Sequence, residues 1–356
     1  MVESKHQWKA WLYLAPALIL LLIFTVWPII NTVSMAFQEE YDYTTIIAIK
    51  NHNKDADKFY EQLEKFDLDN PENPNYIPEE QYPVYYDENP YEFGFENFKR
   101  VLSYGEFGKV LFNTLILCVL TVPISTLLAL LIAVALNSIK PLQRFLQTIF
   151  FLPYVTNSIA IGMVFMAMFH VIGIPGNGDV TQATSVGIIN SAIQFFGGKP
   201  IDWVDGTSSK VANIAVMTIY IVWNALPFKI LVLLGGLQSV NKQYYEAARV
   251  DGTPRRRVFT RITVPLLSPM IAYVVITGFI GGFKEYSSIV GVFGDTMGPA
   301  HDEGRLNTMV GYIYNALSDA GNAAQGRASA AAILLFLIIF AVTMVNLQVS
   351  KKKVHY

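Results

Sequence analysis

The stretch from Glu246 to Pro269 reads EAARVDGTPRRRVFTRITVPLLSP, and it indicates how the rest of the chain is organised. It is polar, strongly basic and interrupted by Gly252, and it lies between two long apolar runs. If those runs cross a membrane, the stretch between them is a loop on one side of it. A loop of this composition then needs either a soluble partner protein or a lipid headgroup surface to bind.

The composition is that of a membrane protein. Of 356 residues, 53% are hydrophobic and 15% are charged, whereas soluble domains contain about 25% charged residues. The apolar residues form runs of about 20 or more with almost no charge, as membrane-spanning helices require. The single cysteine, Cys118, lies in such a run and is expected to be a small buried hydrophobic residue. We therefore predict an all-α integral membrane protein with no disulfide and no cysteine metal site.

Six apolar runs are predicted to be transmembrane helices. They are Trp11–Phe37, Lys109–Asn137, Gln147–Ile172, Val211–Leu237, Val264–Val292 and Ala328–Val349. The first could be mistaken for a cleaved signal peptide, because Lys5 and Lys9 precede it. It is far longer than the apolar region of a secretory signal, which has about 7–15 residues, so we interpret it as an uncleaved span.

Lysine and arginine residues predict the orientation, because short cytoplasmic segments carry an excess of them. They gather at the N-terminus (1–10), at Lys140 and Arg144, in the loop 238–264 and in the tail 350–356. These segments alternate so that all lie on one side, which places both termini in the cytoplasm. The segments Gln38–Gly108, Gly173–Lys210 and Gly294–Arg327 are then external.

The first external loop, 38–108, contains an acidic insertion rich in tyrosine and proline. Phe59, Leu63 and Phe66 have helical spacing, which predicts a short helix over Asp55–Phe66. Five prolines between Pro71 and Pro90 predict an irregular remainder. Two interpretations stay open, a solvated spacer and a docking surface for an external protein.

The loop 238–264 has its own local signals. Asn241–Val250 is predicted to be a short helix, and Gly252 can adopt positive φ and end it. Thr253 and Pro254 suit the cap and first position of a second helix. Two functions fit these features: docking into a groove of a partner protein, or an interfacial segment whose arginines bind lipid headgroups.

The chain contains no sequence signal for nucleotide chemistry or catalysis. A phosphate-binding loop needs G-x-x-x-x-G-K-[ST], and neither Gly108-Lys109 nor Gly198-Lys199 supplies the other elements. The five histidines are scattered, and no Ser/His/Asp cluster or metal-binding set is evident. We therefore expect no cofactor in this chain, no enzymatic activity of its own and no binding of nucleic acid.

The loop resembles the conserved cytoplasmic loop of permease subunits in binding-protein-dependent ATP-binding-cassette importers. That pattern is E-A-A, three residues, Gly, nine residues and I-x-L-P; here it is Glu246–Ala248, Gly252 and Ile262–Pro265, with Val264 in place of leucine. Further segments resemble the carbohydrate branch of this family, the maltose-type and glycerol-phosphate-type permeases. They are LAPALILLLIF from Leu14, GFENFKRVL from Gly94, FNTL from Phe112, QTIFFLPY from Gln147, WNALPF from Trp223, LLGGLQSV from Leu233, NTMVGYIY from Asn307 and GRASA from Gly326.

The chain also departs from the family pattern on its external side. The insertion, roughly Asp42–Pro90, is longer than in a minimal member, and the stretch GNGDVTQATS from Gly176 is expanded. Near Gly294 the usual T-x-G-G-P is replaced by GDTMGP. These departures concern the surface that faces an external binding protein.

The resemblance implies a type I ABC importer permease fold in a bacterial-type cell membrane, with the permease core at 109–349. It implies a second homologous permease subunit, two ATPase subunits that bind ATP and Mg, and an external solute-binding protein. It also implies that part of the loop enters a cleft of the ATPase. The residues concerned are Tyr245, Glu246, Ala247, Ala248, Asp251 and Gly252.

The resemblance further implies where the substrate path lies, in the span before the loop and the span after it. The residues expected there are Ile221, Trp223, Asn224, Ala225, Phe228, Gly281, Gly282, Phe283, Glu285 and Tyr286. Aromatic faces, amides and carboxylates suit a sugar. The alternative is ordinary helix packing, with Gly278 and Gly282 as a close-contact face. Lys229 and Lys284 are expected to extend toward the membrane interfaces.

The sequence thus favours a permease subunit that imports a sugar, an oligosaccharide or a sugar derivative, with ATP hydrolysed by a separate subunit. One alternative is an importer permease for a non-sugar solute. Another is a secondary transporter driven by an ion gradient. That class would predict internal repeats and discontinuous helices at an ion site, neither of which is clear here.

Overall fold

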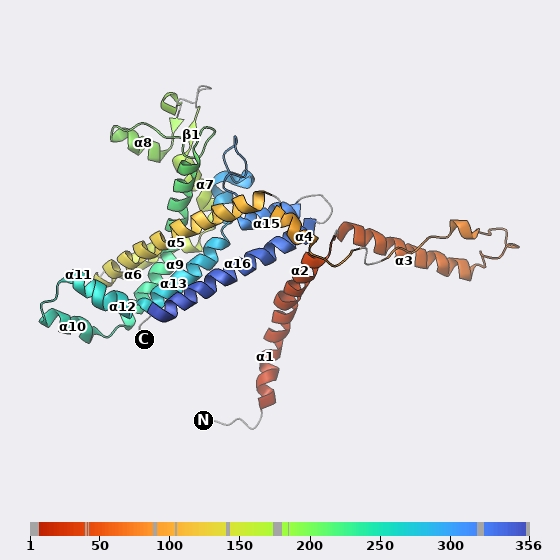
Figure 1. Cartoon of the computed structure of the whole chain (residues 1–356), viewed down its shortest axis with the longest axis horizontal. Helices are drawn as coiled ribbons and strands as arrows, with labels where there is room; N and C mark the ends of the chain where they lie inside the picture. The colour runs from red at the N-terminus through yellow and green to blue at the C-terminus, as the bar shows by residue number, and fades with distance from the viewer. Residues whose placement is uncertain are drawn as a thin grey trace. The chain divides into compact units, whose positions relative to one another are not determined.

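The computed structural model describes residues 7–39, 41, 43–87, 91–103, 105–139, 143–173, 180–183, 185–318 and 324–353, and it is almost entirely helical (Figure 1). Across these ranges the one sheet is a two-stranded antiparallel pair, β1 (Val171–Ile172) and β2 (Ser185–Val186), with Val171 opposite Val186. The chain divides into two compact units, residues 1–104 with 313–333 and residues 105–312 with 334–356. Each is described by itself below.

Four helices among the described residues are long and apolar enough to cross a membrane. They are Trp11–Phe37, Glu106–Ser138, Lys210–Ser239 and Ala324–Lys351. Their limits lie close to those of the first, second, fourth and sixth expected spans. Lys5, Lys140 and Gly176–Asp179, on which part of the sequence argument rested, lie outside the described residues.

The third and fifth expected spans are not single straight helices. The third is divided into α6 (Gln143–Phe151), a 3₁₀ turn (Leu152–Val155) and the shorter apolar helix α7 (Ser158–Phe169). The Asn157 side chain caps α7 by accepting hydrogen bonds from the backbone of Ile159 and Ala160. The fifth falls mainly in the pair Arg255–Leu266 and Ser268–Phe283, which is bent by 67° at the break and is long and apolar enough to cross a membrane only if the two parts are taken together.

In the first unit, the opening span is continuous from α1 (Gln7–Leu21) through a π-helical turn (Leu22–Val26) into α2 (Trp27–Phe37). Pro28 stands in the first turn of α2, just after the π-helical turn, and because it has no N–H it leaves a carbonyl of the preceding turn without its usual backbone donor. No residue of the apolar window of this span is buried within the chain. Its side chains are therefore available to lipid or to another subunit.

The insertion of the first unit is built on α3 (Tyr43–Lys65), which begins well before the expected Asp55. The segment after it, with the 3₁₀ turn Glu79–Gln81, packs back on this helix. Asn53 donates to the Tyr86 carbonyl at 2.9 Å and accepts from the Tyr86 N–H at 3.0 Å. The rings of Tyr60 and Tyr85 are stacked with centroids 5.7 Å apart. These contacts make the tyrosine-rich segment an ordered part of the unit.

Asn97, in α4 (Glu96–Ser103), joins three parts of the first unit. Its amide donates to the carbonyls of Ala36 and Gln38 at 3.2 and 2.8 Å. A Cβ on Gly326 would lie 2.6 Å from the same amide nitrogen. Two of the segments that resemble importer permeases, from Gly94 and from Gly326, therefore meet at this asparagine.

The second unit is a helical core around α9 (Lys210–Ser239), which packs along α5 (Glu106–Ser138), while α13 (Ser268–Phe283) packs against both. Beside them α7 crosses α14 (Ser287–Phe293) at a very close approach, where a Cβ on Gly162 would lie 2.6 Å from the Gly291 Cα. The remaining elements of this unit are the 3₁₀ turn Val180–Gln182, α8 (Ile188–Phe195), α10 (Lys242–Val250), α11 (Arg255–Val258), the π turn Phe259–Thr263, α12 (Val264–Leu266) and the 3₁₀ turn Gly294–Thr296. Two further helices, α15 (Met309–Ser318) and α16 (Ala324–Lys353), have residues in each unit.

Two hydrophobic clusters lie along α9. One contains Met217 and Tyr220, packed with residues of α7 and α14. The other contains Leu233 and Leu234, packed with residues of α5 and α13. The stretch of α9 between these clusters lines a cavity.

Near its N-terminal end, α5 is hydrogen-bonded to a segment that lies far away in the sequence, residues 305–309. Asn113 donates to the carbonyls of Arg305 and Asn307 at 3.0 and 3.1 Å, and it accepts from Lys210 Nζ at 3.0 Å. The next residue, Thr114, accepts from the Met309 N–H at 3.1 Å. The FNTL and NTMV motifs thus contact each other directly, although they lie almost 200 residues apart.

Candidate functional site

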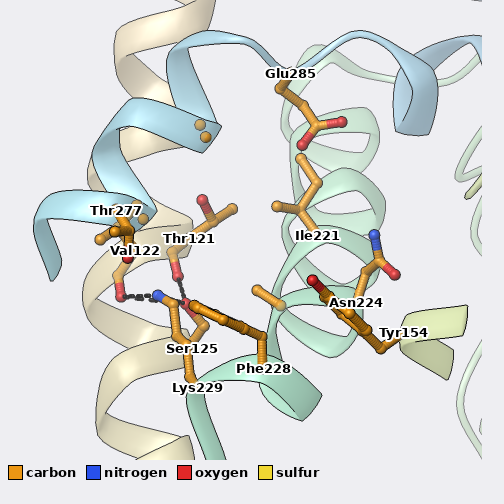
Figure 2. A pocket seen from close by; sticks show the side chains of 14 residues that line it. Thr121, Val122, Ser125, Tyr154, Ile221, Asn224, Phe228, Lys229, Thr277 and Glu285 are labelled. Carbon is orange, nitrogen blue, oxygen red and sulfur yellow. Dashed lines mark hydrogen bonds between the residues drawn. The ribbon is translucent and has the colours of Figure 1, made fainter. Parts of the chain in front are cut away.

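A cavity of about 300 Å³ opens between α5, α9 and α13 in the second unit (Figure 2). Its polar groups come from all three helices, from the 3₁₀ turn after α6 and from the turn that follows α13. The lining residues are Thr121, Val122, Ser125, Tyr154, Ile221, Asn224, Ala225, Phe228, Lys229, Thr277, Gly278, Gly281, Gly282 and Glu285.

Lys229 forms one wall of the cavity by crossing from α9 to α5 (Figure 2). Its Nζ donates to Ser125 Oγ at 2.7 Å, to Thr126 Oγ1 at 3.0 Å and to the Val122 carbonyl at 3.2 Å. Only 4% of the residue is exposed. The expectation that Lys229 extends to the membrane interface is therefore wrong, because acceptors on α5 hold the ammonium inside the helical core.

The α5 hydroxyls are arranged to receive that ammonium. Thr126 Oγ1 donates to the Val122 carbonyl at 2.7 Å, and Ser125 Oγ donates to the Thr121 carbonyl at 2.5 Å. Each hydroxyl proton is thus directed along its own helix, which leaves oxygen lone pairs for Lys229. Polar residues spaced along an otherwise apolar span were the available sequence signal for this wall.

Glu285 supplies the carboxylate of the cavity. It follows Lys284, the C-cap of α13, and lies in the turn before α14. Its Oε1 accepts from the Ser288 N–H at 3.2 Å, and its backbone carbonyl accepts from Thr308 Oγ1 at 2.8 Å. Figure 2 shows the side chain pointing into the space toward Ile221. Lys284 itself is exposed and does not line the cavity.

Aromatic and amide side chains form the other side. The rings of Tyr154 and Phe228 are stacked, with centroids 6.1 Å apart and planes 18° from parallel. Phe228 also contacts Tyr273 at 6.4 Å between centroids. Asn224, one turn earlier on α9, brings an amide to the same space. Flat apolar faces beside amide groups can hold a ligand that has both C–H surfaces and hydroxyls.

The α13 wall is made of glycines with different surroundings. A Cβ on Gly282 would lie 2.8 Å from Cys118 Sγ, and a Cβ on Gly278 would lie 3.1 Å from both Lys229 Nζ and a methyl of Val122. A Cβ on Gly281 would meet nothing within 4 Å. From the sequence, a substrate path and close helix packing stood as alternatives for this segment. The structure shows that α13 has room for both, since Gly278 and Gly282 pack closely and Gly281 faces open space.

Most residues expected in the substrate path line this cavity, namely Ile221, Asn224, Ala225, Phe228, Gly281, Gly282 and Glu285. The others do not. Trp223 packs against Phe165, Phe283 is buried in the helical core, and Tyr286 packs against the cluster around Tyr220. The lining residues that sequence reasoning missed are Thr121, Val122, Ser125, Tyr154, Lys229, Thr277 and Gly278.

The loop that follows α9 forms two short helices. Asn241 caps α10 by accepting from the Gln243 N–H at 3.0 Å. At the other end Gly252 has φ of +64°, the Thr253 N–H donates to the Ala248 carbonyl, and the Gly252 N–H donates to the Arg249 carbonyl. This is the glycine-terminated helix end that the sequence predicted.

The start of the second helix differs from expectation. α11 begins at Arg255, and Pro254, with extended backbone, occupies the cap position without a side-chain hydrogen bond. Thr253 is therefore not the cap, because it stands one residue before the cap position, and its N–H closes the preceding helix. The prediction was wrong by one residue at this boundary.

The six residues expected to contact an ATPase have two different surroundings. Glu246, Ala247, Asp251 and Gly252 are exposed. Ala248 is buried, and Tyr245 is half-buried with its hydroxyl 3.4 Å from Thr263 Oγ1. The exposed group is free to meet another protein, while the other two residues hold α10 to its own chain.

The loop and the cavity share two helical segments. α9 carries Ile221 to Lys229 and leads into α10, while α11 and α12 lead into α13, which carries Thr277 to Gly282. The loop is therefore directly connected in sequence to two of the three helices that enclose the cavity.

Comparison with known proteins bears on this arrangement. The family model described as "Binding-protein-dependent transport system inner membrane component" matches residues 122–355. That range contains the loop, the last long helix and every lining residue of the cavity named above except Thr121.

Curated relatives cover most of the chain. The lactose transport system permease protein LacF of Rhizobium radiobacter is 32% identical over 62% of this chain and 69% of its own length. The trehalose/maltose transport system permease protein MalF of Thermococcus litoralis is 28% identical over 72% and 79%, respectively. The sn-glycerol-3-phosphate transport system permease protein UgpA of Agrobacterium fabrum is 27% identical over 74% and 82%.

Solved structures share the fold. A chain of a bacterial ABC transporter involved in the import of the acidic polysaccharide alginate matches with a TM-score of 0.68, covering 98% of this chain and 96% of that one at 20% identity. The same kind of transporter in complex with an alginate pentasaccharide-bound periplasmic protein gives 0.69. At this identity the likeness establishes the architecture.

Proposed function

Because the chain belongs to the family of inner membrane components of binding-protein-dependent transport systems, we propose that it is a permease subunit that moves a sugar through the membrane by alternating access. The observation that carries this proposal is that the loop and the cavity are built on the same two helices, α9 and α13. The helices on either side of the loop line a polar, aromatic space large enough for part of a saccharide.

Family membership gives the coarser statements. The chain is a multi-pass membrane protein, it works with a binding protein and an ATPase, and it is not the subunit that hydrolyses ATP. We propose further that it pairs with a second homologous permease subunit, that two ATPase subunits bind ATP and Mg, and that the membrane is a bacterial-type cell membrane with both termini in the cytoplasm.

The proposed coupling step begins at the exposed face of α10. Glu246 and Ala247 enter a cleft of the ATPase, and closure of the ATPase pair displaces α10. Because Tyr245 and Ala248 hold α10 to the chain, the displacement is passed to α9 and to the helices that lead into α13. The cavity walls then move relative to α5, which changes the side from which the cavity is open.

A sugar is supported by the chemistry of the cavity together with the relatives. The proteins similar to this chain are named for lactose, trehalose/maltose and arabinooligosaccharides. The stacked rings of Tyr154 and Phe228 offer apolar faces, and Asn224 and Glu285 offer hydrogen-bonding groups for hydroxyls. A non-sugar solute is the alternative substrate, since one relative is named for sn-glycerol-3-phosphate. An ion-driven secondary transporter would have no use for the loop.

The insertion around α3 is proposed as a docking surface for the external binding protein. The ordered packing of Tyr60, Tyr85 and Tyr86 on α3 supports a defined surface over a flexible spacer. Removing residues 55–88 is expected to weaken binding-protein affinity at least tenfold without affecting ATPase binding. Surface plasmon resonance with the permease–ATPase complex in nanodiscs measures the affinity for the binding protein. An unchanged affinity would mean that the insertion is a spacer.

The experiment that tests the proposed function is a mild-detergent pull-down of the tagged chain from its native membrane, followed by reconstitution in proteoliposomes. Recovery of a second permease, an ATPase and a binding protein, with ATP-dependent sugar uptake, is the expected result. Recovery of this chain alone, active under an ion gradient without ATP, would overturn the importer assignment.

A further inference from the structure

The cavity contains two ionisable side chains of opposite charge that differ in their availability to a ligand. The ammonium of Lys229 has three N–H donors, and α5 accepts from it three times, through Val122, Ser125 and Thr126. With 4% of the residue exposed, Lys229 has no donor left for a ligand.

Glu285 has the opposite arrangement. Its carboxylate is half-buried, it points into the space in Figure 2, and the Ser288 N–H is bound to one of its oxygens. A carboxylate offers about four acceptor positions. The backbone N–H groups of Tyr286 and Ser288 and the Ser288 hydroxyl occupy some of them, and the part of the carboxylate that faces the cavity remains for a hydroxyl group of a ligand.

The other polar groups that face the space are uncharged. They are the Asn224 amide and the hydroxyls of Thr121, Ser125, Tyr154 and Thr277. Among the residues that the structure describes, those that line the cavity include no arginine and no histidine. A ligand in this cavity therefore meets neutral donors and acceptors together with one accessible negative charge.

An anionic ligand would be at a double disadvantage here. In a site of low dielectric constant Glu285 would repel it, because charges interact much more strongly there than in water. Lys229 could donate to it only by giving up hydrogen bonds to α5. A neutral saccharide meets neither difficulty, since its hydroxyls donate to Glu285 and its ring lies against Tyr154 and Phe228.

We infer that the cavity selects neutral saccharides over anionic ones such as uronates or sugar phosphates, and that Glu285 is the residue that determines this selectivity. The inference rests on the proposed function and narrows it. It separates this chain from relatives in the same fold that are named for an acidic polysaccharide or for glycerol phosphate.

The test measures binding to the permease itself, without the binding protein, because the latter applies a selection of its own. The purified permease–ATPase complex in nanodiscs is titrated with two matched pairs, lactose with lactobionate and maltose with maltobionate. The wild-type complex is expected to bind at least one neutral member tenfold or more tightly than its acid. Equal or tighter binding of the acids would overturn the inference.

Variants of Glu285 assign the effect to the side chain. Glu285→Gln keeps the size and removes the charge, so the neutral-to-acid ratio is expected to fall at least fivefold through tighter binding of the acid. Glu285→Asp keeps the charge and should retain most of the ratio. Glu303→Gln, the same change at an exposed position that does not line the cavity, is the matched control.

The outcomes separate this inference from the proposed function. A ratio that Glu285→Gln leaves unchanged, in a complex that still binds the neutral sugars, would overturn the role of Glu285 alone. If none of the four probes binds, and the reconstituted complex takes up no sugar, the sugar assignment itself fails, and the inference fails with it.

Discussion

The loop formed by α10 and α11 and the cavity between α5, α9 and α13 are held together by different kinds of interaction. The loop depends on local backbone contacts, such as the Asn241 cap and the closure at Gly252. The cavity depends on side chains more than 100 residues apart, as between Lys229 and Ser125. A change in the loop should therefore affect coupling, and a change in the cavity wall should affect the packing of the whole unit.

Glu246→Lys should have the largest effect. It reverses the charge of an exposed residue at the proposed ATPase contact, so ATP-driven uptake is expected to fall tenfold or more. The fold should be unaffected, because Glu246 is exposed. Uptake and stimulated ATPase activity in proteoliposomes measure the effect, and Glu303→Lys is the control outside the loop. Normal uptake in Glu246→Lys would remove the loop from the coupling mechanism.

Gly282→Ala tests the cavity wall. The added methyl would lie 2.8 Å from Cys118 Sγ, so either the Cys118 side chain or helices α5 and α13 must shift. Overpacking of this kind costs about 1–3 kcal/mol, and the apparent melting temperature should fall by several degrees. The matched control is Gly281→Ala, whose methyl meets nothing within 4 Å.

Adding Cys118→Ala to Gly282→Ala sharpens that test. Removal of the sulfur should restore part of the lost stability, so the double variant should be more stable than the sum of the single changes predicts. Equal losses for Gly281→Ala and Gly282→Ala would mean that the two helices do not approach closely at this point.

Gly252→Ala tests the local construction of the loop. The residue has φ of +64°, which costs an alanine about 1 kcal/mol. The loss should remain within α10, which hydrogen–deuterium exchange detects as faster exchange there and unchanged exchange in α9. Gly206→Ala, at a glycine with no positive φ and with open surroundings, should change nothing. Faster exchange throughout α9 would contradict the local character of the loop.

The smallest effect is expected at Asp302, outside the membrane-spanning segments. A hydrogen bond from Arg305 Nε at 2.7 Å holds the pKa of Asp302 below its usual value of 3.8. Because the folded protein has the lower pKa, the stabilisation is present above pH 3.8 and is lost as the pH falls below it. Between pH 5 and pH 3, Asp302→Asn should lose about one degree less in melting temperature than the wild type. Identical losses would show that the pair contributes nothing.

Sequence reasoning predicted the parts of the site that depend on local sequence, and it missed the parts that depend on contacts between distant segments. Expected cavity residues such as Asn224 on α9 and Glu285 after α13 could be placed because the family resemblance puts the substrate path at fixed sequence distances from the loop. The α5 wall was missed, because no spacing along the chain relates Ser125 to Lys229. Lys229 itself was misassigned, since a lysine near the end of an apolar run has the same sequence pattern whether its ammonium reaches water or a neighbouring helix.

The sequence by itself determined the features that depend on neighbouring residues. Apolar runs determined the long helices, since each must satisfy its own backbone in a membrane. Gly252 determined the end of α10, because it can take a backbone conformation that other residues adopt only at a cost. Tertiary structure alone decided what encloses the cavity. Packing brought Ser125 to Lys229 and left Glu285 open to a ligand, because burial and hydrogen-bond partners are set by which helices meet.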